Sequence, residues 1–138
     1  GLEAAIYSLN LKKNDEIILP AMTWKSTLLS VINNNLKPVL VDIEKNSSNF
    51  DLNDLKKKIN KRTKAITVVH YLGNPVDMIK INKLAKKHNL FVLEDCALAL
   101  GAKIKNKHVG LFGDAGFFSF YPVAFDQCAM LNLHLNCT

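Results

Sequence analysis

The sequence predicts an α/β fold of three layers, in which a mainly parallel sheet is covered by helices on both faces. Two observations predict it. Short apolar runs rich in β-branched residues alternate along the chain with amphipathic helical patterns, as in βαβ units. Breakers such as Pro20, Gly73-Asn74-Pro75 and the glycines between residues 110 and 116 separate these segments. Because crossovers between parallel strands are right-handed, successive helices can cover both faces of one sheet.

Each element can be placed from its pattern. Strands are expected at residues 16–19, 38–42, 65–70, 90–94 and 115–121. Helices are expected at about residues 4–9, 25–34, 52–59 and 77–88. In the last of these helices Met78, Ile81 and Ala85 share one face and lysines occupy the other, so the apolar face predicts contact with the sheet. No internal repeat or linker divides the chain, which predicts a single α/β unit.

Composition disfavours several classes of protein. The 138 residues carry a net charge of +6, with 49% hydrophobic and 22% charged residues, which is ordinary for one globular domain. The lysines are scattered over the expected helices without aromatic residues between them, so we expect a solvated surface and no nucleic-acid partner. No apolar run approaches the roughly 20 residues of a membrane span, and the first residues do not form a signal peptide. The sequence therefore predicts no membrane partner.

Cysteines and histidines form neither a metal pattern nor a disulfide pattern. Cys96, Cys128 and Cys137 are odd in number and have no CxxC spacing, which disfavours a disulfide framework and a zinc site and fits a reducing cytoplasm. The four histidines are isolated from one another and are expected at the surface or as hydrogen-bonded core residues. No metal site is predicted, and a cytoplasmic location is expected.

The ligand site of such a sheet is expected at the carboxyl ends of its strands. Three chemically different side chains lie near or just after the ends of strands there, namely Trp24, Asp95 and Ser119. An aromatic face, a carboxylate and a hydroxyl at one edge favour a small-molecule site. The alternatives are a buried anchor for Trp24, a helix N-cap for Asp95 and an ordinary strand position for Ser119. The chain has no GxGxxG after a strand and no P-loop, which disfavours an unrelated nucleotide-binding α/β protein.

Nine short segments, taken in order, are typical of one family. They are DEIILP (15–20), MTW (22–24), KPVLVDI (37–43), RTKAI (62–66), HYLGNPVDM (70–78), EDCA (94–97), VG (109–110), FGDAG (112–116) and FSFYP (118–122). As an ordered set at this spacing they resemble the DegT/DnrJ/EryC1/StrS aminotransferases over residues 1–123. Each segment alone is a weak signal, and their order makes the resemblance specific.

This resemblance implies part of the large domain of a fold-type-I enzyme that uses pyridoxal phosphate (PLP). Most members of the family transaminate nucleotide-linked keto sugars for cell-surface polysaccharides or related sugars. A nucleotide sugar and an amino donor are therefore the implied small-molecule partners. A homodimer is the implied assembly, because intact members of the family are dimers.

The resemblance also implies roles for individual residues. Asp95 would pair with the protonated pyridine nitrogen, Trp24 would lie against the pyridine ring, and Ser119 would donate its hydroxyl to the cofactor phosphate. The first three residues, Gly1, Leu2 and Glu3, match the family element whose backbone N–H groups cradle that phosphate. Leu98 stands where the family usually has Gln or His near the ring oxygen of the cofactor.

The resemblance ends at Val123. The family continues with a lysine that bonds covalently to PLP, but this position is Ala124, and residues 125–138 contain neither lysine nor glycine. Residues 1–123 are therefore expected to form part of a large domain that is trimmed at its start, and residues 124–138 to form a non-matching tail. Covalent attachment of PLP is impossible at Ala124, which predicts a chain without transaminase activity that still recognises PLP. The alternative is a non-catalytic remnant or interaction module without a ligand.

Overall fold

The computed structural model describes residues 1–45, 47 and 49–120. The strands of its main sheet are β1 (Glu16–Pro20), β2 (Lys37–Val41), β3 (Thr63–Val69), β4 (Phe91–Asp95) and β7 (Ala115–Phe117). The helices are α1 (Leu2–Ser8), α2 (Lys25–Asn33), α3 (Leu52–Lys58), α4 (Met78–His88) and the short 3-10 helix η1 (Tyr71–Gly73). The strands follow the order β2-β1-β3-β4-β7, and the four pairings between them are all parallel. This arrangement confirms the predicted parallel α/β sheet.

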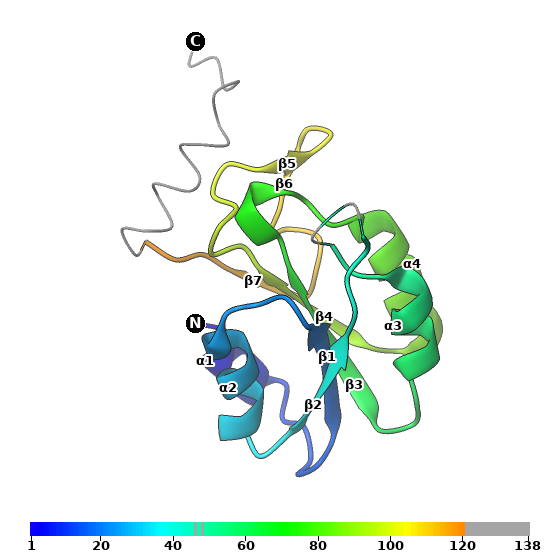
Figure 1. Cartoon of the computed structure of the whole chain (residues 1–138). Helices are drawn as coiled ribbons and strands as arrows, with labels where there is room; N and C mark the ends of the chain where they lie inside the picture. Colours follow the sequence, from blue (N-terminus) through cyan, green and yellow to red (C-terminus); the bar gives the residue numbers. More distant parts are fainter. Residues whose placement is uncertain (46, 48, 121–138) are drawn as a thin grey trace.

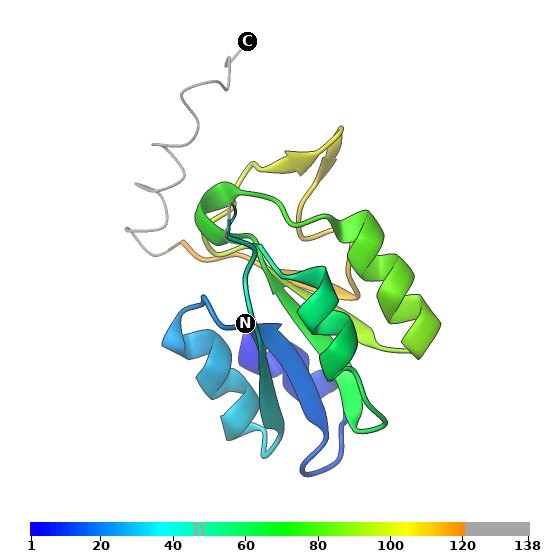
Figure 2. The same ribbon diagram turned by 45° about the vertical axis from the view of Figure 1, so that its right-hand side comes forward.

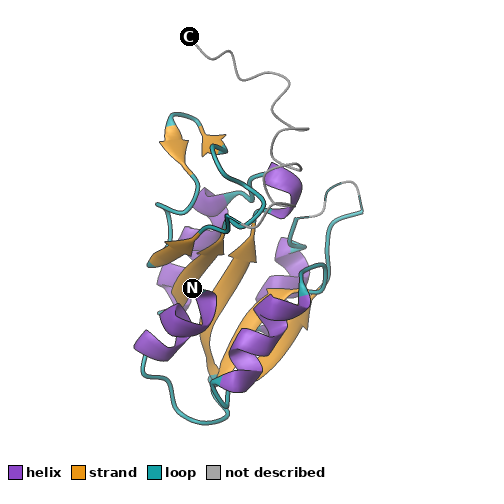
Figure 3. Cartoon of the chain, turned by 90° about the vertical axis from the view of Figure 1, so that its left-hand side faces the viewer, coloured by secondary structure: helices purple, strands orange, loops and turns teal. Residues whose placement is uncertain are grey.

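Helices cover both faces of the sheet and complete the three predicted layers. Helices α1 and α2 lie on one face, and α3 and α4 lie on the other (Figures 1 and 3). Adjacent residues of β1 serve the two sides, because Ile17 belongs to the core under α1 and α2 whereas Ile18 belongs to the core under α3 and α4. Both side chains are fully buried. The continuous apolar run that marks this strand in the sequence therefore reflects burial on both faces.

The helices are short, and two of them are fixed by side chains at their first residues. The carboxylate of Asp51 accepts hydrogen bonds from the backbone N–H groups of Asn53 and Asp54 at the start of α3, at 2.7 and 3.2 Å. Asp77 caps α4 in the same way by accepting from the N–H of Lys80 at 3.1 Å. Each cap satisfies N–H groups that have no partner within the helix. In the described part of the chain, no helix combines the length and the apolar character that crossing a membrane requires.

Two features differ from the expected elements. Strand β7 ends at Phe117, although the sequence predicts a strand over residues 115–121. Its partner β4 ends at Asp95, which pairs with Phe117, so the ladder has no further residue to pair with. A hairpin of β5 (Lys103–Ile104) and β6 (Lys107–His108) is additional, and it stands apart from the main sheet (yellow in Figure 2). Its two-residue strands are too short to give a periodic pattern in the sequence.

Gly116 of β7 lies against the backbone of Gly110, and we expect an alanine at position 116 to destabilise the fold. A Cβ at position 116 would overlap the carbonyl group and Cα of Gly110, which are backbone atoms and cannot rotate away. Gly116→Ala is expected to lower the free energy of unfolding by about 1 to 3 kcal/mol, measured by urea denaturation. Gly1→Ala is the matched control, because its Cβ would make an ordinary contact at 3.5 Å from that of Phe117. Equal losses in the two variants would contradict the prediction.

Candidate functional site

The carboxyl ends of the parallel strands share one edge of the sheet, toward which the arrowheads of the main strands point in Figure 3. Trp24 follows β1 and is the N-cap residue of α2. Asp95 is the last residue of β4, and Ser119 follows the end of β7 by two residues. Because β7 pairs directly with β4, the segments that carry Asp95 and Ser119 are neighbours. Three of the predicted site residues therefore belong to segments at this one edge.

Asp95 is held firmly within this edge. It shares its strand face with Leu93, which packs with α1 and α2, so its side chain lies on that side of the sheet. Oδ1 of Asp95 accepts a hydrogen bond from the backbone N–H of Ala97 at 3.1 Å, and Oδ2 accepts one from the hydroxyl of Thr27 at 3.0 Å. The residue is only 6% exposed. Two donors from different elements thus hold a buried carboxylate in one orientation.

Thr27 is a residue of this site that the sequence analysis does not identify. It lies in the first turn of α2, is 1% exposed, and accepts a hydrogen bond from the hydroxyl of Thr23 at 2.9 Å. The two threonines stand four residues apart, and Thr23 lies just before Trp24, the N-cap residue of α2. That spacing is a weak signal in the sequence. The acceptor Asp95 is 68 residues away along the chain, and the fold alone brings it to Thr27.

Burial raises the pKa of Asp95 above the ordinary aspartate value. The backbone N–H of Ala97 and the hydroxyl of Thr27 lower this pKa, but they do not outweigh burial. None of the ion pairs formed within the described part of the chain involves Asp95. A buried carboxylate that has neutral donors and forms no ion pair with any described residue is a favourable place for a cationic group of a ligand.

Trp24 presents its indole ring at the surface, at the start of the helix that carries Thr27. Its exposed fraction is 54%, which does not fit the alternative of a buried anchor. The carbonyl oxygen of Trp24 accepts the backbone N–H of Thr27 at 3.0 Å, so the ring and the threonine belong to one helical turn. An exposed indole in this position is available to stack on a flat ring.

The other predicted cofactor contacts lie at the start of α1 and after β4. Gly1 is the N-cap of α1 and lies against β7, Leu2 is buried in the core under α1 and α2, and Glu3 is exposed. The carbonyl oxygen of Glu3 accepts a hydrogen bond from the side chain of Asn34 at 3.2 Å, which joins α1 to the end of α2. Leu98 lies in the turn after β4 and is 7% exposed. These residues are positioned mainly by helix packing and core contacts.

On the opposite face of β4, Glu94 binds two loops together. Its Oε1 accepts hydrogen bonds from the backbone N–H groups of Phe112 and Gly113, both at 2.6 Å. Its Oε2 accepts the N–H of Gly110 at 2.8 Å and lies 3.1 Å from Nε2 of His70. Burial raises the pKa of Glu94, but the hydrogen bonds from His70 and from the three N–H groups outweigh it and hold the pKa below the usual range.

The hydrogen bonds of His70 define its tautomer and its role. Its Nδ1 accepts the backbone N–H of Val76 at 3.1 Å, so the hydrogen of the neutral ring is on Nε2 and is donated to Glu94. Within the described residues, His70, Glu94 and Cys96 are the group whose possible metal ligands lie within 4.8 Å of one another. Burial, together with the charges of Glu94 and Asp95, raises the pKa of the Cys96 thiol, and a protonated thiol is a poor ligand. The trio fits a structural role, with His70 as a hydrogen-bonded core histidine.

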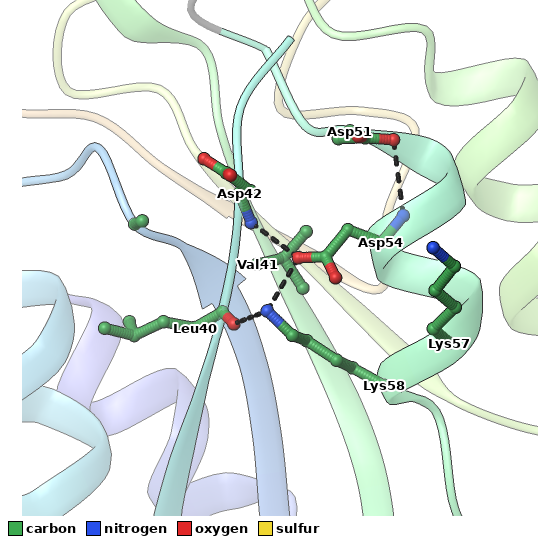
Figure 4. A pocket seen from close by; sticks show the side chains of 8 residues that line it. Leu40, Val41, Asp42, Asp51, Asp54, Lys57 and Lys58 are labelled. Atoms are coloured by element: carbon green, nitrogen blue, oxygen red, sulfur yellow. Dashed lines mark hydrogen bonds and ion pairs between the residues drawn. The ribbon is translucent and has the colours of Figure 1, made fainter.

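A second concave feature lies at the outer edge of the sheet, between β2 and α3 (Figure 4). This hollow of about 390 Å³ is lined mainly by Leu40, Asp42, Asp51, Asp54, Lys57 and Lys58. Lys58 donates to the Asp54 carboxylate at 2.6 Å and to the Leu40 carbonyl at 2.7 Å. The same carboxylate accepts the N–H of Asp42 at 2.8 Å. These bonds fix α3 to the edge strand, and none of the predicted site residues lines the hollow.

A parallel sheet covered by helices on both faces is the fold of fold-type-I PLP-dependent aminotransferases, which are among the structural neighbours of the chain. The family model of the DegT/DnrJ/EryC1/StrS aminotransferases matches residues 1–125. The chain belongs to this family, which confirms the resemblance and the fold predicted from the motifs.

Individual relatives agree with this assignment. The chain is 46% identical over 123 residues to a dTDP-3-amino-3,6-dideoxy-alpha-D-galactopyranose transaminase from Aneurinibacillus thermoaerophilus, covering 87% of this chain and 34% of the relative. It is 41% identical over 121 residues to the GDP-perosamine synthase of Escherichia coli O157:H7, covering 88% and 33%. A solved structure of an E. coli GDP-4-keto-6-deoxy-D-mannose-3-dehydratase with bound hydrated PLP superposes with a TM-score of 0.80 and 38% identity, covering 87% and 32%.

The chain spans about a third of the length of the relatives that it matches. The PLP-dependence of the family and of its structural neighbours supports PLP as the cofactor class. The domain boundary at residue 123 stays a prediction. Ala124 and the tail lie outside the described residues.

Proposed function

We propose that this chain supplies a PLP-binding face of an aminotransferase that acts on nucleotide-linked keto sugars. The observation that carries the proposal is the buried carboxylate of Asp95, which accepts hydrogen bonds from two neutral donors. None of the ion pairs among the described residues includes Asp95. The protonated nitrogen of a pyridine ring would supply the missing positive charge. Relatives named for GDP-linked and dTDP-linked amino sugars support the substrate class.

When bound, PLP supplies an electron sink, because its cationic ring accepts electrons from a neighbouring bond. Asp95 favours the protonated ring nitrogen by facing it with a carboxylate. The low exposure of Asp95 keeps water from this pair, which strengthens the attraction. Trp24 contributes a flat apolar surface that orients the ring with little loss of side-chain entropy.

We assign the cofactor phosphate to the backbone N–H groups of Gly1, Leu2 and Glu3, together with the hydroxyl of Ser119. Gly1 lies against the end of β7, and Ser119 follows that strand by two residues, so the two segments are close. N–H groups at the start of a helix attract anions through their unpaired hydrogens and the helix dipole. Leu98 offers the ring oxygen no hydrogen bond, which would weaken the orientation of the cofactor without abolishing its binding.

Ala124 stands where the family has its lysine, so we propose that this chain holds PLP without a covalent bond. Alanine offers neither a nucleophile nor a base, and transamination by this chain alone is not expected. A nucleotide-linked keto sugar and an amino donor would be the partners of a relative that carries the lysine. The alternative is a remnant or interaction module without a ligand, and it differs in predicting no binding of PLP.

We further propose a homodimer located in the cytoplasm. Leu29 and Ile32 of α2 are 44% and 47% exposed, and Tyr7 of the neighbouring α1 is 79% exposed. A second copy of the chain would remove these apolar side chains from water. Cys96 is a buried free thiol, as a reducing compartment favours.

Fluorescence titration tests the cofactor proposal. Pyridoxamine phosphate is the better probe, because it lacks the aldehyde with which PLP reacts with surface lysines. Trp24 is the single tryptophan of the chain, so its emission reports on a ring bound beside it. We expect saturable quenching by both pyridoxamine phosphate and PLP, after correction with free tryptophan titrated in the same way. A response that never saturates would favour the module without a ligand.

A further inference from the structure

Thr27 connects the proposed cofactor site to the first turn of α2. We propose that Thr27 is a positioning residue, whose hydroxyl fixes the Asp95 carboxylate in the orientation that meets the pyridine nitrogen. This inference rests on the proposed function and deepens it, because it names the group that sets the geometry of the acid.

The carboxylate of Asp95 needs two anchors to be fixed. Ala97 holds Oδ1 through a backbone N–H two residues along the chain, a local contact that leaves rotation about the Cβ–Cγ bond. Thr27 belongs to a different element, the first turn of α2, and its hydroxyl donates to Oδ2 of Asp95 at 3.0 Å. With both anchors in place the plane of the carboxylate is defined. Each oxygen can accept a second hydrogen bond, so acceptor capacity remains for a ligand.

The direction of the Thr27 hydroxyl is defined as well. A hydroxyl has one hydrogen to donate, and that of Thr27 is directed to Asp95, while its oxygen accepts from Thr23 at 2.9 Å. Donation by Thr23 polarises the Thr27 hydroxyl and strengthens its own hydrogen bond. Thr27 is 1% exposed, so water does not compete for this contact. The hydroxyl of Ser30 donates to the Thr27 carbonyl at 2.8 Å and holds the turn in place.

The same turn also carries the proposed stacking residue. The backbone N–H of Thr27 donates to the carbonyl of Trp24 at 3.0 Å, so the indole and the hydroxyl move together with the start of α2. One helical turn would thus set both the plane of the ring and the direction of its acid partner. The pattern Thr23-Trp24 followed by Thr27 is therefore a functional unit in this chain.

Two substitutions test the role of the hydroxyl. Thr27→Val removes the hydroxyl and keeps the shape of the side chain, whereas Thr27→Ser keeps the hydroxyl. We expect Thr27→Val to raise the pKa of Asp95, followed by the carbon-13 shift of its carboxyl group in the chain without cofactor, because a donor to the charged form is lost. The same variant is expected to weaken binding of pyridoxamine phosphate by about three- to tenfold, and Thr27→Ser to restore both values.

The outcomes separate this inference from the proposed function. An Asp95 pKa that is equal in Thr27→Val and the parent chain would overturn the inference, whatever the cofactor does. A raised pKa in the variant, with no binding of pyridoxamine phosphate by the parent, would overturn the proposed function and with it the cofactor role of Thr27. Should Thr27→Val fail to fold, the parent chain still decides, because the Thr27 methyl resonance is expected to titrate together with Asp95. A methyl resonance that does not follow Asp95 would overturn the inference.

Discussion

Replacing Glu94 by alanine is expected to lower the free energy of unfolding by about 3 to 5 kcal/mol. The substitution removes the acceptor of three backbone N–H groups and of the His70 ring hydrogen. Both Glu94 and His70 are fully buried, so water does not replace the lost partner of the His70 ring hydrogen, and such an orphaned donor costs about 1 to 3 kcal/mol. The three backbone N–H groups belong to half-buried residues and lose less each. Domains are stable by only about 5 to 15 kcal/mol, which brings Glu94→Ala close to global unfolding. Urea denaturation followed by circular dichroism measures the change.

Two further variants separate the hydrogen bonds of Glu94 from its size and charge. Glu94→Gln keeps the shape of the side chain, but its amide group would face donors at Gly110 or His70, so a smaller loss is expected. Glu44→Ala removes an exposed carboxylate and is expected to change stability by less than about 0.5 kcal/mol. If Glu94→Ala were as stable as Glu44→Ala, the carboxylate would not hold the loops together.

The pH dependence of stability provides an independent check on Glu94. Its pKa in the folded chain is lowered from the ordinary value of 4.5, so its stabilisation is fully present above that value and is lost as the pH falls through the lower folded pKa. Glu16, held by Asn60 and Arg62 against the opposing effect of burial, also has a lowered pKa and acts in the same direction. As the pH is lowered past about 4.5, we expect the melting temperature of the parent chain to decrease. The melting temperature of Glu94→Gln is expected to decrease less steeply over the same range.

Much of the fold could be predicted from the sequence, because buried positions of strands and helices appear as regularly spaced or continuous apolar residues. The apolar run at residues 16–19 predicted β1, whose residues are buried on both faces. The helix predicted from residue 77 begins at Met78, because Asp77 is its cap, and its apolar face of Met78, Ile81 and Ala85 is buried as expected. The hairpin of β5 and β6 left no such trace, since two residues cannot show a period.

The site was only partly accessible, because a hydrogen-bond partner has no periodicity. The rule for parallel sheets located Asp95 and Trp24 at the carboxyl edge. It could not show that Thr27 donates to Asp95, since only tertiary packing brings together residues 68 positions apart. Glu94 was identified only as part of a motif, although its carboxylate organises the loops on the other face of the sheet. Glu94 and Asp95 are adjacent in β4, but their side chains lie on opposite faces of the sheet, because side chains alternate along a strand. Their hydrogen-bond partners therefore differ.

Asp95→Asn is expected to weaken binding of pyridoxamine phosphate by about tenfold to a hundredfold, because one charge-assisted hydrogen bond to the cofactor is lost. The substitution keeps the size of the side chain and removes the negative charge that would face the protonated ring nitrogen in the proposed site. Trp24 fluorescence measures the dissociation constant of the variant and the parent under the same conditions. Asp77→Asn is the matched control, because asparagine caps a helix as well as aspartate does and Asp77 lies at the start of α4.

Stability is expected to move in the opposite direction from affinity. Burial raises the pKa of Asp95 above its ordinary value of 3.8, so the folded chain favours the neutral acid. The contribution of Asp95 to stability is therefore fully present below pH 3.8 and falls as the pH rises through the folded pKa. Above the folded pKa the buried charge opposes folding, and Asp95→Asn removes it. The amide oxygen of asparagine can still accept from Ala97, and its amide nitrogen can donate to the hydroxyl oxygen of Thr27. We therefore expect the variant at neutral pH to melt no lower than the parent, while it binds the cofactor more weakly. A binding residue that destabilises the empty chain is typical of a functional site. A variant that loses stability yet keeps full affinity would instead assign Asp95 to the fold alone.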